Sequence, residues 1–383
     1  MNGDLVTIVP CADYEPAHCE AAIEKALRPL GGLDWVRPGM KIAIKANFVA
    51  AAKPERAVTT HPNMLLALAR MLNARGASVV IGDSPGNLYN AAVLNHVYAS
   101  LGLDRAECDG IALNRDFSEK QAYAPDAVQA KTFTYTRYLD DADAIINFCK
   151  LKSHGMMALS CAAKNLFGVI PGTMKPEYHY RFPNPNDFAD MIVDLDEYFK
   201  PVVHLCDAVM AMEGNGPTQG TPRHIGCVLA SRNPHGLDLL AATMIGLDPY
   251  TVPTIAAARR RHLVPERFEQ LSVQGDWKPL VPKGFQCIKN RNSTLFINGD
   301  SLFGRIGQKA LNLCLASRPQ VKADACVGCG RCVNVCPAHT ITLKNGKAHI
   351  RRKDCIKCFC CQEFCPKGAM QVHRTAIARL LNK

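Results

Sequence analysis

The sequence predicts an α/β protein with two unequal parts: a large domain whose mostly parallel sheet is flanked by helices, and a small α+β module at the C-terminal end. Two observations lead to this fold class. Strand-like and helix-like segments alternate over most of the chain, a pattern typical of parallel sheets. A duplicated cysteine spacing then fills the last part of the chain. With 383 residues, 48% of them hydrophobic, the chain can bury a sizeable core.

The first clear unit of the large domain is a strand, a helix and a second strand. Residues Lys41–Val49 and Ala77–Gly82 are rich in apolar and β-branched side chains, as buried strands are. Between them, Pro62–Arg75 has helical composition. The proline at its first position and Thr60 or His61 as its cap favour a helix start there.

The alternation continues along the large domain. Further strands are predicted at Ala144–Leu151, Val202–Met210 and His224–Ser231, and further helices at Asp187–Phe199 and Leu237–Ile245. Ligands of such parallel α/β sheets bind at the carboxyl ends of the strands. The predicted strand ends are therefore the places to look for functional side chains.

The chain divides into four predicted segments. The large domain spans 1–316, and residues 317–323 form a linker. The cysteine-rich module spans 324–370, and a short basic helix is expected at 371–383.

The cysteines of the module form two copies of one motif, Cys-x2-Cys-x2-Cys-x3-Cys-Pro. The first copy contains Cys326, Cys329, Cys332 and Cys336, and the second contains Cys355, Cys358, Cys361 and Cys365. In two-cluster ferredoxins with this spacing, the fourth cysteine of each copy serves the other cluster. We therefore expect two [4Fe–4S] clusters in a ferredoxin-like module, with Cys365 completing the first ligand set and Cys336 the second. A pair of zinc sites is the alternative, but zinc does not explain three evenly spaced cysteines plus Cys-Pro, twice.

Basic residues are concentrated in this module. From Arg318 to Lys383 there are 13 Lys+Arg and 3 Asp+Glu, whereas the whole chain carries a net charge of +11. A basic patch can bind nucleic acid. Here the cations are better explained by the negative charge of thiolate-ligated clusters, so nucleic acid is not an expected partner.

The chain begins without a basic and apolar signal segment, and it contains no apolar run of 18 residues. Its 18 cysteines therefore suit metal ligation in a reducing compartment better than a disulfide framework. A cytoplasmic location without a membrane span is expected.

Polar side chains gather near the predicted strand ends of the large domain. They are Lys45, Asn47, His61, Asp83, Lys150, Lys152, His154, Lys164, Asn165, Lys175, His179, Asp207, Glu213, Gly214 and Gly216. Lysines in one cleft create a positive field for an anion, and glycines let the backbone approach a ligand. Each residue also has a structural interpretation, such as a solvated lysine or a helix-capping histidine. As a set they predict a site for a small anionic ligand.

Several of these stretches resemble the DUF362 family, a domain of unknown function that is often followed by a two-cluster ferredoxin module. The matching stretches are K-A-N-F from Lys45, T-T-H-P from Thr59, G-D-S-P-G from Gly82, K-L-K-S-H from Lys150, A-K-N-L-F-G from Ala163 and A-M-E-G-N-G-P-T-Q-G from Ala211. One departure is Cys149, where family members commonly have proline. The resemblance implies the architecture and the site, and it supplies no reaction.

These observations favour an iron–sulfur protein that passes electrons to an anionic substrate or cofactor in the large domain, as a reductase of anaerobic metabolism. Lys45, Lys150, Lys152 and Lys164 are expected to hold the anion, with help from Asn47 and Asn165. His61, His154 or His179, or Lys152, would donate the proton. Asp83, Asp207 and Glu213 would bind a divalent metal or orient a lysine. No nucleotide-binding glycine motif of the G-x-G-x-x-G or G-x-x-x-x-G-K-[ST] type supports a dinucleotide or ATP.

Two other functions fit the same sequence. In the first, the protein is an accessory electron-transfer or maturation factor that reduces a partner enzyme, and the basic run Arg351-Arg352-Lys353 is its docking patch. In the second, the clusters sense oxygen or redox state, although a sensor seldom needs two clusters. The expected redox partner is an external low-potential electron donor or acceptor of the ferredoxin or flavodoxin type.

Overall fold

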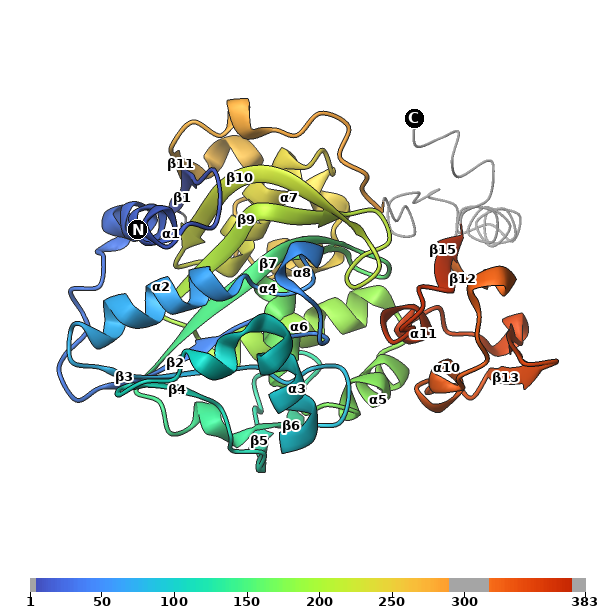
Figure 1. Cartoon of the computed structure of the whole chain (residues 1–383). Helices are drawn as coiled ribbons and strands as arrows, with labels where there is room; N and C mark the ends of the chain where they lie inside the picture. The colour runs from blue at the N-terminus through green and yellow to red at the C-terminus, as the bar shows by residue number, and fades with distance from the viewer. Residues whose placement is uncertain (1–4, 289–316, 374–383) are drawn as a thin grey trace.

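The structure is a computed structural model that describes residues 5–288 and 317–373. One large sheet forms the centre of the large domain (Figure 1). Across the sheet the strands are β11 (Ser272–Gln274), β1 (Leu5–Pro10), β10 (Thr221–Ser231), β9 (Val203–Glu213), β7 (Ala144–His154), β2 (Lys41–Lys45), β3 (Ser78–Gly82) and β4 (Ile111–Leu113). Strand β8 (Ala158–Ser160) pairs with β7, and β5 (Glu119–Tyr123) and β6 (Thr132–Thr136) form a separate hairpin.

The sheet is mostly parallel, which confirms the predicted fold class. Strands β9, β7, β2, β3 and β4 run parallel to their neighbours in that order, and β1 is parallel to β11. Strand β10 is antiparallel to both β1 and β9, because a short loop returns the chain from β9. The site faces the carboxyl ends of the parallel strands.

Helices cover both faces of the sheet (Figure 1). They are α1 (Pro16–Leu27), α2 (Pro62–Asn73), α3 (Ala91–Leu101), α4 (Ala162–Asn165), α5 (Met174–Arg181), α6 (Pro185–Phe199), α7 (Pro234–Met244) and α8 (Pro253–Arg260). The first three pack in one apolar cluster with the sheet, and apolar residues of α4 to α8 lie in two others. Within the described residues, no helix has the length and apolarity needed to cross a bilayer.

Helix α2 shows how local sequence sets the elements. Its cap is His61, whose ring Nδ1 accepts the amide hydrogen of Asn63 at 3.2 Å. Pro62 occupies the first helical position, where its missing N–H has no partner to lose. The start of the helix therefore agrees with the sequence prediction.

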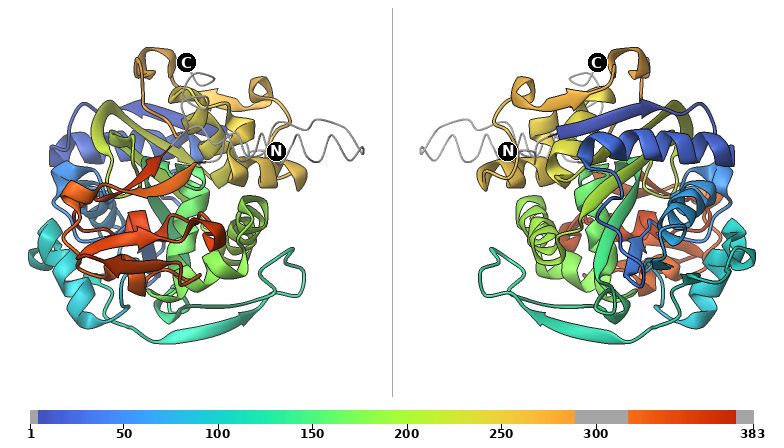
Figure 2. Two further views of the ribbon diagram at one scale, coloured as in Figure 1. Left: turned by 90° about the vertical axis from the view of Figure 1, so that its right-hand side faces the viewer. Right: turned by 90° about the vertical axis from the view of Figure 1, so that its left-hand side faces the viewer.

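The C-terminal module is small and held by two short strand pairs. Strand β12 (Arg318–Val321) pairs with β15 (Met370–His373), and β13 (Ile341–Lys344) pairs with β14 (Lys347–Ile350). Two short helices, α10 (Arg331–Asn334) and α11 (Cys360–Glu363), complete it. The left view of Figure 2 shows this module in front of the large domain.

Two predicted boundaries differ from the structure. The segment 317–323, expected to be a linker, contains β12, because its backbone finds hydrogen-bond partners on β15. The segment 371–383, expected to be a helix, begins with the last residues of β15, and 374–383 lies outside the described residues.

The module docks on the large domain through α11 and the loop between β9 and β10 (Figure 1). Phe359 is 4% exposed and lies in the same apolar cluster as Met156 and Met157 of the large domain. Thr218 donates its hydroxyl hydrogen to the carbonyl of Glu363 at 3.0 Å, and Gln219 donates to the carbonyl of Cys365 at 2.9 Å. The two parts therefore share both an apolar and a polar contact.

Candidate functional site

A polar cavity of about 50 Å³ lies where the large domain meets α11. Most of its polar wall comes from the large domain: Asn47, Asp83, Ser84, Lys152, Ser160, Lys164, Asn165, Lys175 and His179. The module closes it with Cys360, Glu363 and Phe364. We call this space the inner cavity. It has room for a few water-sized groups, which suits a small anion or the anionic end of a larger molecule.

Three lysines give the inner cavity its positive charge. Lys152 Nζ donates to Asn47 Oδ1 at 2.7 Å and to the Val58 carbonyl at 2.8 Å. Lys175 Nζ donates to the carbonyls of Ser84 at 3.0 Å and Ile170 at 2.5 Å. Lys164 Nζ lies 5.3 Å from the centre of the Phe167 ring. In the described part of the chain, none of the three forms an ion pair with a carboxylate.

Burial makes these amines unusually acidic. It lowers the pKa of both Lys152 and Lys175 to about 7, and neighbouring charges that include Lys164 contribute. Burial also lowers the pKa of Lys164, while the Glu363 carboxylate opposes that shift. An anion that entered the cavity would stabilise all three ammonium forms.

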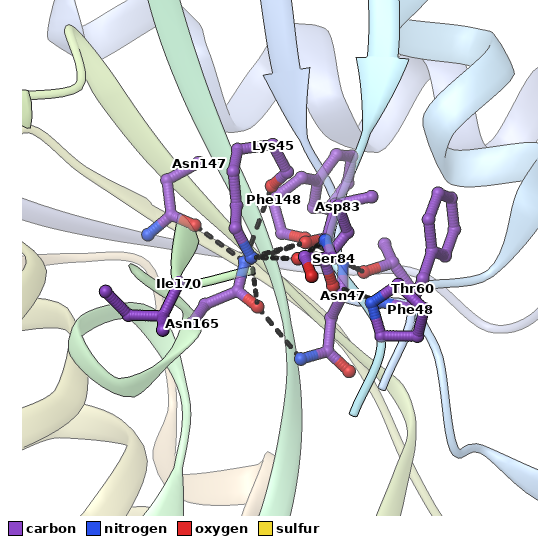
Figure 3. Close-up of polar contacts among 12 residues, drawn as sticks. Lys45, Asn47, Phe48, Thr60, Asp83, Ser84, Asn147, Phe148, Asn165 and Ile170 are labelled. Carbon is purple, nitrogen blue, oxygen red and sulfur yellow. Dashed lines mark hydrogen bonds and ion pairs between the residues drawn. The ribbon is translucent and has the colours of Figure 1, made fainter. Parts of the chain in front are cut away.

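Lys45 does not serve the inner cavity directly. Its Nζ forms an ion pair with Asp83 Oδ1 at 2.8 Å and donates to the Ala46 carbonyl at 3.0 Å (Figure 3). Asp83 in turn accepts the amide hydrogens of Phe48 and Ser84. Asn165 lies beside the pair and links it to Asn47 and to Asn147 of β7 (Figure 3). Lys45 therefore has a structural role: it fixes the positions of Asp83 and Asn165, which line the inner cavity.

Lys150 belongs to a second group of polar residues outside the inner cavity. Its Nζ pairs with Asp207 Oδ2 at 2.8 Å, the residue opposite it on β9. Tyr14 bridges the two through its hydroxyl, and its ring stacks on His61 at 3.6 Å between centres. The structure thus separates Lys150 and His61 from Lys152 and Lys164. Strand β7 runs on to His154, so Lys150 lies inside a strand and not at its end as expected.

His154 links the two domains. Its Nδ1 accepts the amide hydrogens of Met156 and Met157, each at 3.1 Å, so the proton is assigned to Nε2. Nε2 lies 3.0 Å from Glu363 Oε1. Burial lowers the pKa of His154 to about 4. Burial would raise the pKa of Glu363, but His154 and Lys164 lower it to about 2. A neutral histidine thus faces an ionised glutamate.

Of the three histidines named in the sequence, His179 is the one that lines the inner cavity. Its ring stacks on Phe188 at 4.3 Å, and its Nδ1 has no hydrogen-bond partner among the described residues. Burial lowers its pKa to about 3, so the imidazole is neutral at physiological pH.

The Glu213–Gly216 loop makes contacts within the protein. Glu213 Oε2 accepts the amide hydrogen of Gln286 at 3.0 Å, and the Gly214 carbonyl accepts the hydroxyl hydrogen of Ser153 at 2.8 Å. A Cβ at Gly216 would overlap the Ser153 carbonyl. Gly216 therefore allows the loop to approach β7 closely, and the loop reaches the inner cavity through Pro217.

The eight motif cysteines form two groups in space. Cys326, Cys329, Cys332 and Cys365 line one small cavity, and Cys336, Cys355, Cys358 and Cys361 line another. Each group takes its fourth cysteine from the other motif, which is the crossed arrangement expected of two-cluster ferredoxins. The donor set, four thiols around one space, fits a [4Fe–4S] cluster in each.

Cys360 connects the second cysteine group with the inner cavity, because its side chain lines both spaces. Helix α11 carries Cys361 toward the cysteine group and Glu363 toward the lysines. A predicted cluster ligand, Cys361, is thus the direct chain neighbour of a residue in the cavity wall, Cys360.

A wider groove of about 460 Å³ lies outside the inner cavity. Pro176 and Phe364 line both spaces, so they stand between them. The ring of Phe364 lies close over Gly86, where a Cβ would come within 2.8 Å of it. Tyr180 and Arg331 are also in the groove wall, which has the volume of a typical small-molecule site.

The sequence did not single out Ser160, Glu363 or Phe364. It predicts that Cys360 packs beside the ligand Cys361 and is not itself a ligand. Glu363 and Phe364 lie between cluster cysteines, where a motif analysis assigns only the cysteines. Their role depends on the contact between α11 and the large domain. The spacing of residues within either domain does not predict that contact.

Comparisons with known proteins agree with this architecture. Residues 42–243 match the family described as domain of unknown function DUF362, and residues 318–366 match the 4Fe-4S dicluster domain. The chain is 33% identical over 270 residues to the thylakoid-associated protein sll1697 of Synechocystis sp., covering 69% of this chain and 81% of that protein. It is 57% identical over 28 residues to Ferredoxin-2 of Desulfomicrobium norvegicum, covering 7% of this chain and 48% of that protein.

Two solved structures are more distantly similar. The lactate racemase apoprotein from Thermoanaerobacterium thermosaccharolyticum matches with a TM-score of 0.39 and 13% identity, over 60% of this chain and 54% of that one. A Thermotoga maritima protein matches with a TM-score of 0.37 and 14% identity, over 56% and 55%. The chain thus spans about half the length of each. On the family matches, the chain belongs to the DUF362 family and carries a C-terminal iron–sulfur domain of the 4Fe-4S dicluster type.

Proposed function

We propose that the protein is an oxidoreductase that reduces a small anionic substrate, or the anionic end of a larger one, in the inner cavity. The observation that carries this proposal is the shared wall at Cys360, between the lysine-lined cavity and the second cysteine group. Two [4Fe–4S] clusters, when bound, would supply electrons one at a time.

The cavity walls favour an anion on grounds of charge. The cavity wall contains three lysines and two carboxylates, Glu363 and Asp83, and Asp83 is neutralised by Lys45. Few water molecules screen charges in so small a space, so an anion gains strongly from the ammonium groups.

The same lysines are the better proton donors. A general acid works best when its pKa lies near the working pH. The pKa of Lys152 and Lys175 is about 7, whereas burial lowers the pKa of His154 to about 4 and that of His179 to about 3. We therefore assign proton donation to Lys152 or Lys175, and anion binding to Lys164.

Substrate would arrive through the outer groove. The groove is large enough for a drug-sized molecule and meets the inner cavity at Phe364 and Pro176. The exposed Cys329 of the first cysteine group lies at the module surface, which suits electron delivery from an external ferredoxin- or flavodoxin-type donor.

The test is an anaerobic assay on the reconstituted protein. Reduced methyl viologen serves as donor, and a panel of small oxyanions and carboxylates is screened for viologen oxidation. Lys164→Ala and Lys175→Ala should lower kcat/KM by about 100-fold or more while iron content stays unchanged. Lys120→Ala, which changes an exposed lysine paired with Asp140, is the control. Full turnover in both cavity variants would contradict the proposal.

An accessory role is the second candidate. It is favoured by the basic run Arg351-Arg352-Lys353, which is exposed and lies one residue before the second cysteine motif. Such a surface suits an acidic partner enzyme. A stoichiometric partner that co-purifies, with redox turnover only in its presence and unaffected by Lys164→Ala, would favour this role over the enzyme.

A further inference from the structure

Three thiols outside the cluster motifs meet in the interior of the large domain. Cys149 of β7 and Cys206 of β9 are opposite each other in the parallel pairing, and Cys161 precedes α4. Cys161 Sγ lies 3.7 Å from Cys149 Sγ and 3.5 Å from Cys206 Sγ, and all three sulfurs lie within 4.8 Å of one another. Their exposed fractions are 0%, 1% and 0% for Cys149, Cys161 and Cys206.

The sulfur spacing is that of a metal–thiolate site. With metal–sulfur bonds of about 2.3 Å, neighbouring sulfurs are about 3.8 Å apart at tetrahedral angles and about 4.0 Å apart in a trigonal plane. Both measured distances are slightly shorter than these values. A shift of a few tenths of an ångström would therefore admit an ion without rebuilding the strands.

The surroundings of the three thiols are not wholly apolar. The carboxylate of Asp238 accepts the amide hydrogens of Ala162 at 2.7 Å and Ala163 at 3.2 Å, directly after Cys161. Asp238 is buried, so it places a polar side chain at the same end of α4. Cys227 of β10 is equally buried but stands outside the group, so burial of cysteine alone does not produce the cluster.

We propose that Cys149, Cys161 and Cys206 bind one thiophilic metal ion, Zn²⁺ or Cu⁺, at a structural site separate from the iron–sulfur module. Thiolate ligands select these ions over harder cations. Binding converts three thiols to thiolates and releases three protons to solvent. The ion would tie β7, β9 and the start of α4 together, and α4 carries Lys164 and Asn165 to the inner cavity.

The test measures zinc, copper and iron in the full-length protein, purified anaerobically, by inductively coupled plasma mass spectrometry. We expect about one zinc or copper per chain in addition to iron, and the element found decides between the two ions. Protein that lacks both is titrated with Zn²⁺ or Cu⁺ against a chromophoric chelator, and one equivalent should bind. X-ray absorption at the edge of the bound metal should show three sulfur ligands at about 2.3 Å.

Matched variants separate this site from nonspecific binding. Cys161→Ser and Cys206→Ser should lose the zinc or copper while retaining iron, and Cys227→Ser should keep both. The X-ray absorption of the unaltered protein decides the question if a variant does not fold. The proposal is overturned if the unaltered protein takes up neither ion, if the bound metal lacks sulfur ligands, or if Cys161→Ser binds as much metal as Cys227→Ser.

Discussion

At the scale of single residues, the lysines of the family-like stretches divide into two kinds. Lys45 and Lys150 each have a dedicated carboxylate, Asp83 and Asp207, and are buried. Lys152, Lys164 and Lys175 rest on neutral oxygens or an aromatic ring. The first kind stabilises the fold at the site, and the second kind is available to a ligand.

A substitution at Gly168 tests the structural role of the paired lysine Lys45. A Cβ at this position would overlap both Lys45 Nζ and Asp83 Oδ1. Gly168→Ala should therefore disrupt a buried ion pair and lower the free energy of unfolding by about 3–5 kcal/mol. Urea denaturation followed by circular dichroism measures it. Gly155→Ala, whose added Cβ would meet its nearest atoms at 3.4 Å, should change stability much less.

The pH dependence of anion binding tests the role of the lysines that do not pair with a carboxylate. Lys152 and Lys175, each with a pKa of about 7, are charged below that pH and neutral above it. Affinity for sulfite or nitrate, measured by isothermal titration calorimetry, should thus decrease as the pH rises through 7. The limiting slope is about tenfold per pH unit for each lysine that must be charged. Affinity that is constant from pH 6 to 9 would contradict this account, and Lys175→Met should flatten the profile.

At the scale of elements, helix α11 and the β9–β10 loop determine how the module meets the sheet. Gln362 donates to the Asn215 carbonyl at 2.8 Å, and Thr218 and Gln219 donate to carbonyls of the module. These contacts fix Glu363 opposite His154 and so complete the inner cavity. Gly214 and Gly216, expected to approach a ligand, both instead contact Ser153 of β7.

A double variant of the loop tests this docking. Thr218→Val with Gln219→Ala removes two hydrogen bonds worth about 1 kcal/mol each. Amide hydrogen exchange in residues 363–370 should become faster, while iron content remains unchanged because no cysteine is altered. Gln121→Ala, at an exposed position on β5, is the control. Unchanged exchange in the double variant would show that the remaining contacts, among them those of Phe359, Gln362 and Glu363, are sufficient to hold the module.

Much of the fold follows from the sequence because its signals are local. The cap and proline of α2, the apolar strands β2 and β3, and the cysteine motifs each depend on neighbouring residues. Whether a given lysine pairs with a carboxylate does not depend on its neighbours in the sequence. Lys45 meets Asp83 only through the β2–β3 register, and Lys150 meets Asp207 only through the β7–β9 register. The spacing of lysines along the chain carries no such information.

At the scale of the whole molecule, the large domain and the iron–sulfur module form one site. The inner cavity has walls from both, and Cys360 and α11 lie between the lysines and the second cysteine group. The three lysines come from the large domain, and the large domain alone leaves the cavity open on the side of Glu363. The account's central claim is that an anion in this cavity lies beside the second cysteine group.

Electron paramagnetic resonance of the reduced protein tests that claim most directly. Spectra are recorded anaerobically during titration with sulfite, nitrate and acetate, for the unaltered protein, Lys164→Ala and the control Lys120→Ala. We predict that at least one anion shifts the signal of one iron–sulfur cluster saturably, that Lys164→Ala abolishes the shift, and that Lys120→Ala retains it. Spectra that no anion changes, or a shift that persists in Lys164→Ala, would contradict the account.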